Sequence, residues 1–123
     1  MRIGIVGCAG RMGRENLREV LTTQGVELAG GIERPGSPAL GQDLGVLAGL
    51  DPIGRTCSED AMALVQASDV LIEFSSPAAT LQHAALCAHS GRAHVIGTTG
   101  LSEADEQRLR DLAVAIPIVW APN

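Results

Sequence analysis

Three glycines recur at every third position near the start of the chain, at Gly7, Gly10 and Gly13. They follow the apolar run 3–6 and precede a stretch with the apolar spacing of a helix. In such a unit the first glycine permits a tight turn, the second lets the backbone approach a phosphate, and the third lets the helix pack closely on a sheet. The spacing therefore indicates a turn whose backbone N–H groups, with the helix N-terminus, bind the pyrophosphate of a dinucleotide.

An acidic residue, Glu33, ends the next apolar run, about 20 residues after Gly13, which is the spacing of a carboxylate that binds ribose hydroxyls. Ala9 stands where the simplest glycine fingerprint has its second glycine, so the glycines alone also fit an ordinary strand-to-helix turn of another α/β domain. The strand before the glycines, the helix after them and the terminal acid together favour the dinucleotide site.

The remainder of the chain alternates apolar runs with helical patterns, which predicts an α/β fold: one Rossmann-type, doubly wound parallel sheet in a single three-layer domain over residues 1–123. We expect strands at 2–7, 26–33, 69–74, 93–96 and 118–120. We expect helices at 11–24, 77–90 and 103–114, a shorter one that opens at Ser58-Glu59-Asp60 and runs to about residue 66, and either a functional loop or a short helix at 43–48.

The expected strands end in small, polar or glycine-rich segments, and the carboxyl ends of parallel strands meet at one edge, where ligands bind. These segments are Gly7–Gly13, Glu33-Arg34, Phe74–Pro77, Gly97–Gly100 and Ala121–Asn123. Gly97, Thr98 and Thr99 could offer backbone groups and hydroxyls to a flat amide-bearing ring such as nicotinamide, although the same segment also fits a plain turn.

Composition excludes several classes of function. A net charge of −5 and an aromatic content of 2% argue against nucleic-acid binding. No apolar run is long enough for a membrane span and no signal peptide is evident. The cysteines are scattered, which suits a reducing cytoplasm; they are Cys8, Cys57 and Cys87.

Few side chains in this chain are candidates for catalysis. We interpret Cys8 as a small residue that fills a tight turn, with a reactive thiol as the alternative. The three histidines are interpreted as surface or packing residues, and no set of side chains has the spacing of a metal site. All nine basic residues are Arg, so the chain cannot itself supply a Lys acid, base or Schiff base. We therefore assign no catalytic residue and no metal ligand.

The chain resembles the N-terminal half of dihydrodipicolinate reductase, an enzyme family of lysine biosynthesis. The segments that carry the resemblance are Gly-Cys-Ala-Gly-Arg-Met-Gly-Arg (7–14), Ile-Glu-Arg (32–34), Asp-Val-Leu-Ile-Glu-Phe-Ser (69–75), Val-Ile-Gly-Thr-Thr-Gly (95–100) and Ala-Pro-Asn (121–123). The resemblance implies an NADH- or NADPH-binding domain whose parent protein reduces 4-hydroxy-tetrahydrodipicolinate, a small dicarboxylate, to tetrahydrodipicolinate.

The resemblance also implies roles for single residues. Glu33 would bind the adenosine ribose hydroxyls, and Arg34 would lie near adenine and face a 2′-phosphate. The pyrophosphate would be held by Gly7, Cys8, Ala9, Gly10, Arg11 and Met12. The remaining cofactor contacts would come from Phe74, from Gly97, Thr98 and Thr99 on the nicotinamide side, and from Ala121, Pro122 and Asn123, which would close over it. Some family members carry a basic residue where Ser76 stands, so the preference between NADH and NADPH stays open.

The family's substrate and catalytic domain is absent from these 123 residues, and we expect a fragment that binds cofactor without turnover. A homo-oligomer is compatible with the sequence. Two alternatives are a stand-alone nucleotide-binding or sensor module and the nucleotide domain of a different two-domain dehydrogenase.

Overall fold

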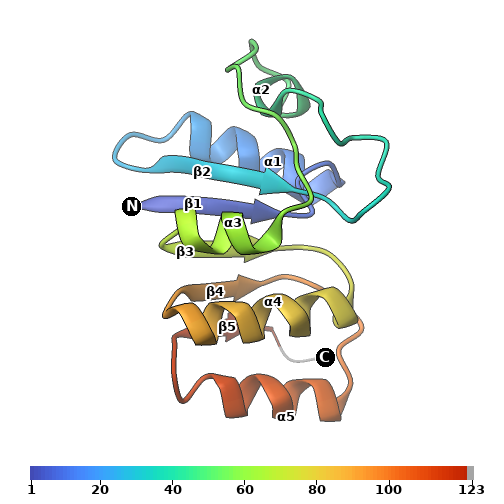
Figure 1. Cartoon of the computed structure of the whole chain (residues 1–123), viewed down its shortest axis with the longest axis vertical. Coiled ribbons are helices and arrows are strands. Elements are labelled where there is room, and N and C mark those ends of the chain that lie inside the picture. The colour runs from blue at the N-terminus through green and yellow to red at the C-terminus, as the bar shows by residue number, and fades with distance from the viewer. Residues whose placement is uncertain (122–123) are drawn as a thin grey trace.

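The computed structural model describes residues 1–121 and forms one parallel sheet in the order β2-β1-β3-β4-β5 (Figure 1). The strands are β1 (Arg2–Val6), β2 (Glu27–Ile32), β3 (Val70–Glu73), β4 (Ala93–Ile96) and β5 (Ile118–Trp120). The helices are α1 (Arg11–Leu21), α2 (Leu44–Leu47), α3 (Ala61–Ala67), α4 (Pro77–Ser90) and α5 (Glu103–Leu112). The strand order reverses between β1 and β3, the place where ligands bind in doubly wound sheets. The predicted Rossmann-type α/β fold is confirmed.

Helices pack on both faces of the sheet. On one face α1 and α2 cover β1 and β2, with Leu17 of α1 and Leu44 of α2 in the same cluster as Ile5. On the opposite face α3 and α4 pack over β1 to β4, and α5 lies beside α4 (Figure 1). A bulge in β2 shifts its register against β1, so that Leu28 packs on the α1 side whereas Ile32 packs on the α3 side.

Most predicted element boundaries agree with the structure to within two residues, and two that differ by three residues require correction. The helix predicted to reach residue 24 ends at Leu21, because the hydroxyls of Thr22 and Thr23 bond to carbonyls of the preceding turn. The helix expected to open at Ser58-Glu59-Asp60 begins at Ala61, and Asp60 alone caps it by accepting from the Ala63 N–H. The backbone around Ser58 pairs instead with the end of β2.

The caps of α4 and α5 agree with the sequence patterns. Ser76 caps α4 and Pro77 occupies its first position, while Gly91, at φ 70°, ends it. Ser102 and Asp105 form a capping box at the start of α5, which ends two residues before the predicted boundary.

The long connection between β2 and α3 is ordered around one carboxylate. Asp43 caps α2, and its side chain also accepts from the backbone N–H groups of Ile53 and Gly54. The expected short helix is thus present, and its apolar residues Leu44 and Leu47 are buried against α1.

One side of the sheet keeps an apolar row in contact with solvent. Ile72, Val95 and Val119 lie in register across β3, β4 and β5. Val95 is 38% exposed and Val119 61% exposed.

Among residues 1–121, no helix is long and apolar enough to cross a membrane.

Candidate functional site

The glycine loop joins β1 to α1, and each of its glycines meets a different constraint. Gly7 has φ 80°, and a side chain there would clash with the Phe74 carbonyl. A side chain on Gly13 would clash with the loop backbone, so this glycine lets α1 pack on the loop. A Cβ on Gly10 would meet only one neighbour, the Gly7 carbonyl at 3.4 Å. The geometry leaves the space in front of Gly10 open, which is where a phosphate needs to approach.

The N-terminus of α1 is not capped by any side chain of the described residues. Gly10 is its N-cap in extended backbone conformation, and Arg14 donates to the Ala9 carbonyl at 2.7 Å, which holds the loop against the helix. The first N–H groups of α1 therefore keep their capacity to bind an anion, with the helix dipole in support.

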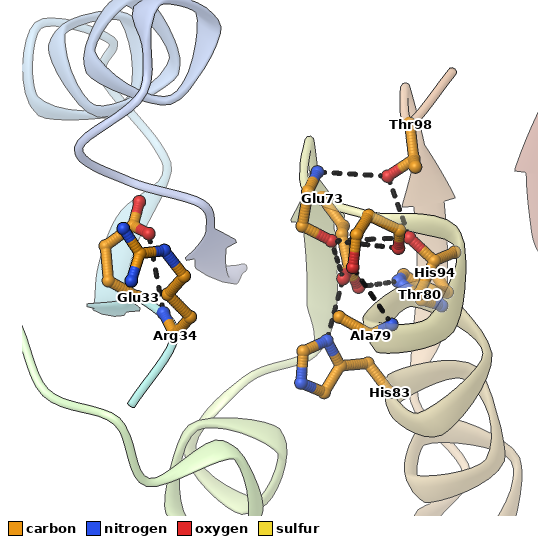
Figure 2. Close-up of polar contacts among 10 residues, drawn as sticks. Glu33, Arg34, Glu73, Ala79, Thr80, His83, His94 and Thr98 are labelled. Atoms are coloured by element: carbon orange, nitrogen blue, oxygen red, sulfur yellow. Dashed lines mark hydrogen bonds and ion pairs between the residues drawn. The ribbon is translucent and has the colours of Figure 1, made fainter. Parts of the chain in front are cut away.

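Glu33 lies directly beside the glycine loop. Its Oε2 accepts from the Ala9 N–H at 2.9 Å, and its Oε1 accepts from the Arg34 N–H at 3.4 Å. The Arg34 side chain is exposed next to it and forms no ion pair within residues 1–121 (Figure 2). One residue pair thus presents a positioned carboxylate and an unpaired guanidinium at the end of β2.

A cavity of about 370 Å³ connects these groups to the end of β3. Its walls include Gly7, Gly10, Glu33, Arg34 and Phe74, all of them expected binding residues. The N-terminal half of α4 closes the opposite side with Ser76, Ala79, Gln82 and His83. Since the cavity lies at the carboxyl ends of β1, β2 and β3, it occupies the switch point of the sheet.

The other expected binding residues within residues 1–121 do not line the cavity. Cys8 is fully buried behind the loop, and burial, chiefly, raises the pKa of its thiol well above the usual range, which fits the interpretation as a packing residue. Ala9 contributes its N–H to Glu33. Arg11 and Met12 are exposed on the first turn of α1. Ala121 is exposed after β5, whereas Pro122 and Asn123 lie outside the described residues.

The segment after β4 packs against the segment after β3. The ring of Phe74 lies where a side chain on Gly97 would be, so only glycine fits there. The Thr98 hydroxyl points inward, 2.7 Å from the Thr80 hydroxyl, and accepts from the Ser75 N–H at 3.1 Å. Thr99 is exposed. A ligand at this edge would thus meet Thr99 and backbone groups, while Thr98 fixes the position of the loop.

A buried carboxylate, which sequence reasoning missed, lies beneath this edge (Figure 2). Glu73 has no exposed surface; its Oε1 lies 2.9 Å from His94 Nε2 and its Oε2 lies 2.7 Å from His83 Nδ1. The Ser75 hydroxyl donates to Oε2 at 2.5 Å. Burial opposes ionisation, but the hydrogen bonds from His83, His94 and Ser75 outweigh it and hold the Glu73 pKa at about 2.

Two sets of side-chain contacts could not be predicted from the sequence, because the residues that form them lie far apart along the chain. Glu73 looked like part of an apolar strand, and its two histidine partners come from α4 and β4. Cys8 and Cys57, 49 residues apart, have their sulfurs 3.4 Å from one another. The neighbouring residues in the sequence give no indication of either set of contacts. The one available signal was an acid inside the run Val70–Phe74, because a buried charge requires partners.

Comparison with known proteins gives one family for the whole chain. The family model described as "Dihydrodipicolinate reductase, N-terminus" matches residues 1–123. The 4-hydroxy-tetrahydrodipicolinate reductase of Parvibaculum lavamentivorans is 49% identical, and that of Citrifermentans bemidjiense is 44% identical. Each match covers 100% of this chain and 46% of the relative. The chain thus spans about half the length of the curated relatives it matches.

Solved structures agree on the fold. A dihydrodipicolinate reductase from Paenisporosarcina sp. TG-14, bound to dipicolinate, superposes with a TM-score of 0.74 at 24% identity, over 100% of this chain and 47% of that one. The WlbA dehydrogenase of Thermus thermophilus, in complex with NAD and α-ketoglutarate, superposes with a TM-score of 0.71 at 14% identity, over 98% of this chain and 41% of that one. These likenesses establish the Rossmann-like α/β fold.

Proposed function

The chain belongs to the family of dihydrodipicolinate reductase N-terminal domains, and from that membership we propose that it binds NADH or NADPH as the nucleotide-binding domain of a reductase. The parent protein would reduce 4-hydroxy-tetrahydrodipicolinate to tetrahydrodipicolinate in the cytoplasm, within lysine and diaminopimelate biosynthesis. Support comes from relatives named for this reductase at 44% and 49% identity. A module for nucleotide sensing, or a domain of an unrelated dehydrogenase, has no comparable support.

The observation that carries the proposal is the combination of an open Gly10, an uncapped α1 and a carboxylate fixed beside them. The pyrophosphate would lie against the N–H groups that follow Gly10, where no Cβ obstructs it. Glu33 is held at the loop by the Ala9 N–H, so its second oxygen is positioned to accept from ribose hydroxyls. Phe74 and Thr98 hold the Gly97–Gly100 segment, which would bind the nicotinamide side through backbone groups and Thr99.

The bound nicotinamide would supply a hydride from its C4 atom. This chain's part is to bind and orient the dinucleotide, and the dicarboxylate substrate would be bound by a second domain of the parent protein. We expect no turnover by the 123 residues themselves, because they contain no Lys and offer one wall of a cleft rather than two. The assay is consumption of NADH with freshly generated substrate; turnover comparable to that of a full-length reductase would contradict this part of the proposal.

The glycine loop is tested by Gly10→Val. The valine would fill the space in front of the loop, so we expect binding of NADH and NADPH to disappear in a calorimetric titration while the circular dichroism spectrum stays close to that of the unchanged chain. Ala115→Val, in an exposed turn after α5, is the matched control and should bind normally. Normal NADH binding by a folded Gly10→Val protein would show that the loop is not the phosphate site.

A further inference from the structure

Two cysteines that are far apart in sequence meet directly behind the glycine loop. Cys8 lies in the loop and Cys57 in the segment that leads to α3, and the Cys8 thiol donates to the Cys57 sulfur across 3.4 Å. Both thiols are free, with 0% and 3% of their surface exposed. Van der Waals contact between two free thiols is the arrangement from which a disulfide forms with the least backbone movement.

We propose that Cys8 and Cys57 form a reversible disulfide under oxidising conditions and that this bond weakens dinucleotide binding. The oxidant is a hydroperoxide. The first thiolate attacks the peroxide oxygen, which gives a sulfenic acid and releases water or an alcohol. The second thiol then attacks that sulfur and expels water, so that two thiols lose two electrons and two protons to one peroxide. A dithiol reductant reverses the reaction.

The order of the two steps follows from the hydrogen bond. Because the Cys8 thiol donates and the Cys57 sulfur accepts, Cys57 is the sulfur whose thiolate is stabilised, and it reacts first. Burial raises the pKa of both thiols, and the charge of Glu33 adds to this effect. Oxidation is therefore slow, on a scale of minutes to hours, which is within the range of disulfide formation in folded proteins.

The disulfide would affect the binding site because Cys8 is fully buried and is part of the glycine loop. The sulfur separation must shrink from 3.4 Å to about 2.05 Å. The Cys8 side chain is fully buried and fills the space that Gly31 of β2 leaves by having no side chain, since an added Cβ there would lie 3.1 Å from both Cβ and Sγ of Cys8. The approach of the two sulfurs would then shift the loop backbone, and with it the Ala9 N–H that is bonded to Glu33.

The experiment compares reduced and hydroperoxide-treated protein by intact mass, peptide mapping and calorimetric titration with NADH. We expect a mass loss of about 2 Da, a cross-linked peptide that contains Cys8 and Cys57, and at least tenfold weaker NADH binding, all restored by dithiothreitol. Cys57→Ala should bind NADH as the reduced protein does, and treatment with the hydroperoxide should not change its NADH affinity. Cys87→Ala removes a buried thiol from a different core cluster and should keep the full response. Thermal unfolding of both variants verifies that they fold.

The experiment separates failure of the proposed disulfide from failure of its proposed effect on NADH binding. The absence of the cross-link after prolonged oxidation would overturn the modification site, and a cross-link that leaves NADH affinity unchanged would overturn the switch. The weakened binding rests on the proposed function, whereas the cross-link does not. If reduced protein does not bind NADH, the proposed function and the switch fail together, and mass alone still decides whether the disulfide forms.

Discussion

Glu33 and Arg34 would act in opposite directions on a 2′-phosphate at the end of β2. The carboxylate would favour a free ribose hydroxyl and repel a phosphate, while the exposed guanidinium would attract the phosphate. Opposite charges near a surface interact by up to about 4 kcal/mol before screening, so the two effects are similar in size. We expect NADH and NADPH affinities to lie within about a hundredfold of one another, or roughly 2.7 kcal/mol, in calorimetric titration. A larger preference in either direction would contradict this balance.

The guanidinium can be tested separately. Arg34→Ala should weaken NADPH binding by about 1.5–3 kcal/mol, the range for a hydrogen bond to a charged group, and leave NADH binding nearly unchanged. Arg108→Ala, on the exposed side of α5, controls for the lost net charge. An equal loss for both cofactors would place Arg34 away from the 2′ position.

Glu73 is expected to stabilise the fold in a pH-dependent way. Its pKa is about 2 in the folded chain against a usual 4.5. A carboxyl with a lowered folded pKa stabilises the fold above its unfolded pKa, and the stabilisation fades as pH falls toward the folded pKa. Glu73→Gln should therefore reduce the free energy of unfolding by roughly 3 kcal/mol at pH 6, and the difference from the unchanged chain should shrink between pH 4.5 and 2.

Urea denaturation across this pH range measures the difference. Glu59→Gln, which changes an exposed acid in the wall of the 370 Å³ cavity, should change stability little at any of these pH values. A Glu73→Gln protein as stable as the unchanged chain at pH 6 would show that the histidine contacts contribute nothing net, which can occur when desolvation offsets a buried ion pair.

At the scale of elements, Asp43 is expected to hold the connection between β2 and α3 together. Its carboxylate accepts from four backbone N–H groups, and these bonds with Ile53, Gly54, Val46 and Gly45 lower its pKa despite an opposing desolvation. In Asp43→Ala we expect amide hydrogen exchange at Ile53 and Gly54 to accelerate by at least tenfold. Asp51→Ala, whose side chain has no such bonds among the described residues, should leave their protection intact.

Local patterns predicted most of the elements because their causes are local. Ser76 with Pro77 starts α4, Gly91 ends it, and short apolar runs place β4 and β5 at the predicted residues. The start of α3 was wrong because Ser58, Glu59 and Asp60 all suit a cap, and only the pairing of the Ser58 segment with β2 decides among them. That pairing is a tertiary contact with no signature in the neighbouring residues.

The same distinction between local patterns and tertiary contacts applies to the candidate site. Gly7, Gly10, Gly13 and Glu33 were identifiable because their spacing is fixed by the turn and the next strand. The Glu73 cluster was not, since its two histidine partners lie 10 and 21 residues away on separate elements. The sequence could name the groups that would face a ligand, whereas the buried contacts that fix those groups required the structure.

At the scale of the whole molecule, the exposed row of Ile72, Val95 and Val119 is expected to drive self-association. It ends at β5, which is an edge strand of the sheet formed by residues 1–121 and can offer backbone groups to another chain. We expect a concentration-dependent mass in light scattering, lowered toward the monomer by Val119→Lys. Val114→Lys lies outside the row at a 90% exposed position and should have no effect. A stable monomer at high concentration would contradict this expectation.

The central claim, that the glycine loop and the adjoining cavity bind a nicotinamide dinucleotide, is tested most directly by backbone amide NMR shifts during titration with NADH. We expect the largest shifts at the amides from Ala9 to Gly13, then at Glu33 and Arg34, and at Gly97 and Thr99. Amides in α5 should stay in place. Saturable binding with shifts confined to other surfaces, or no shifts at millimolar NADH, would contradict the claim.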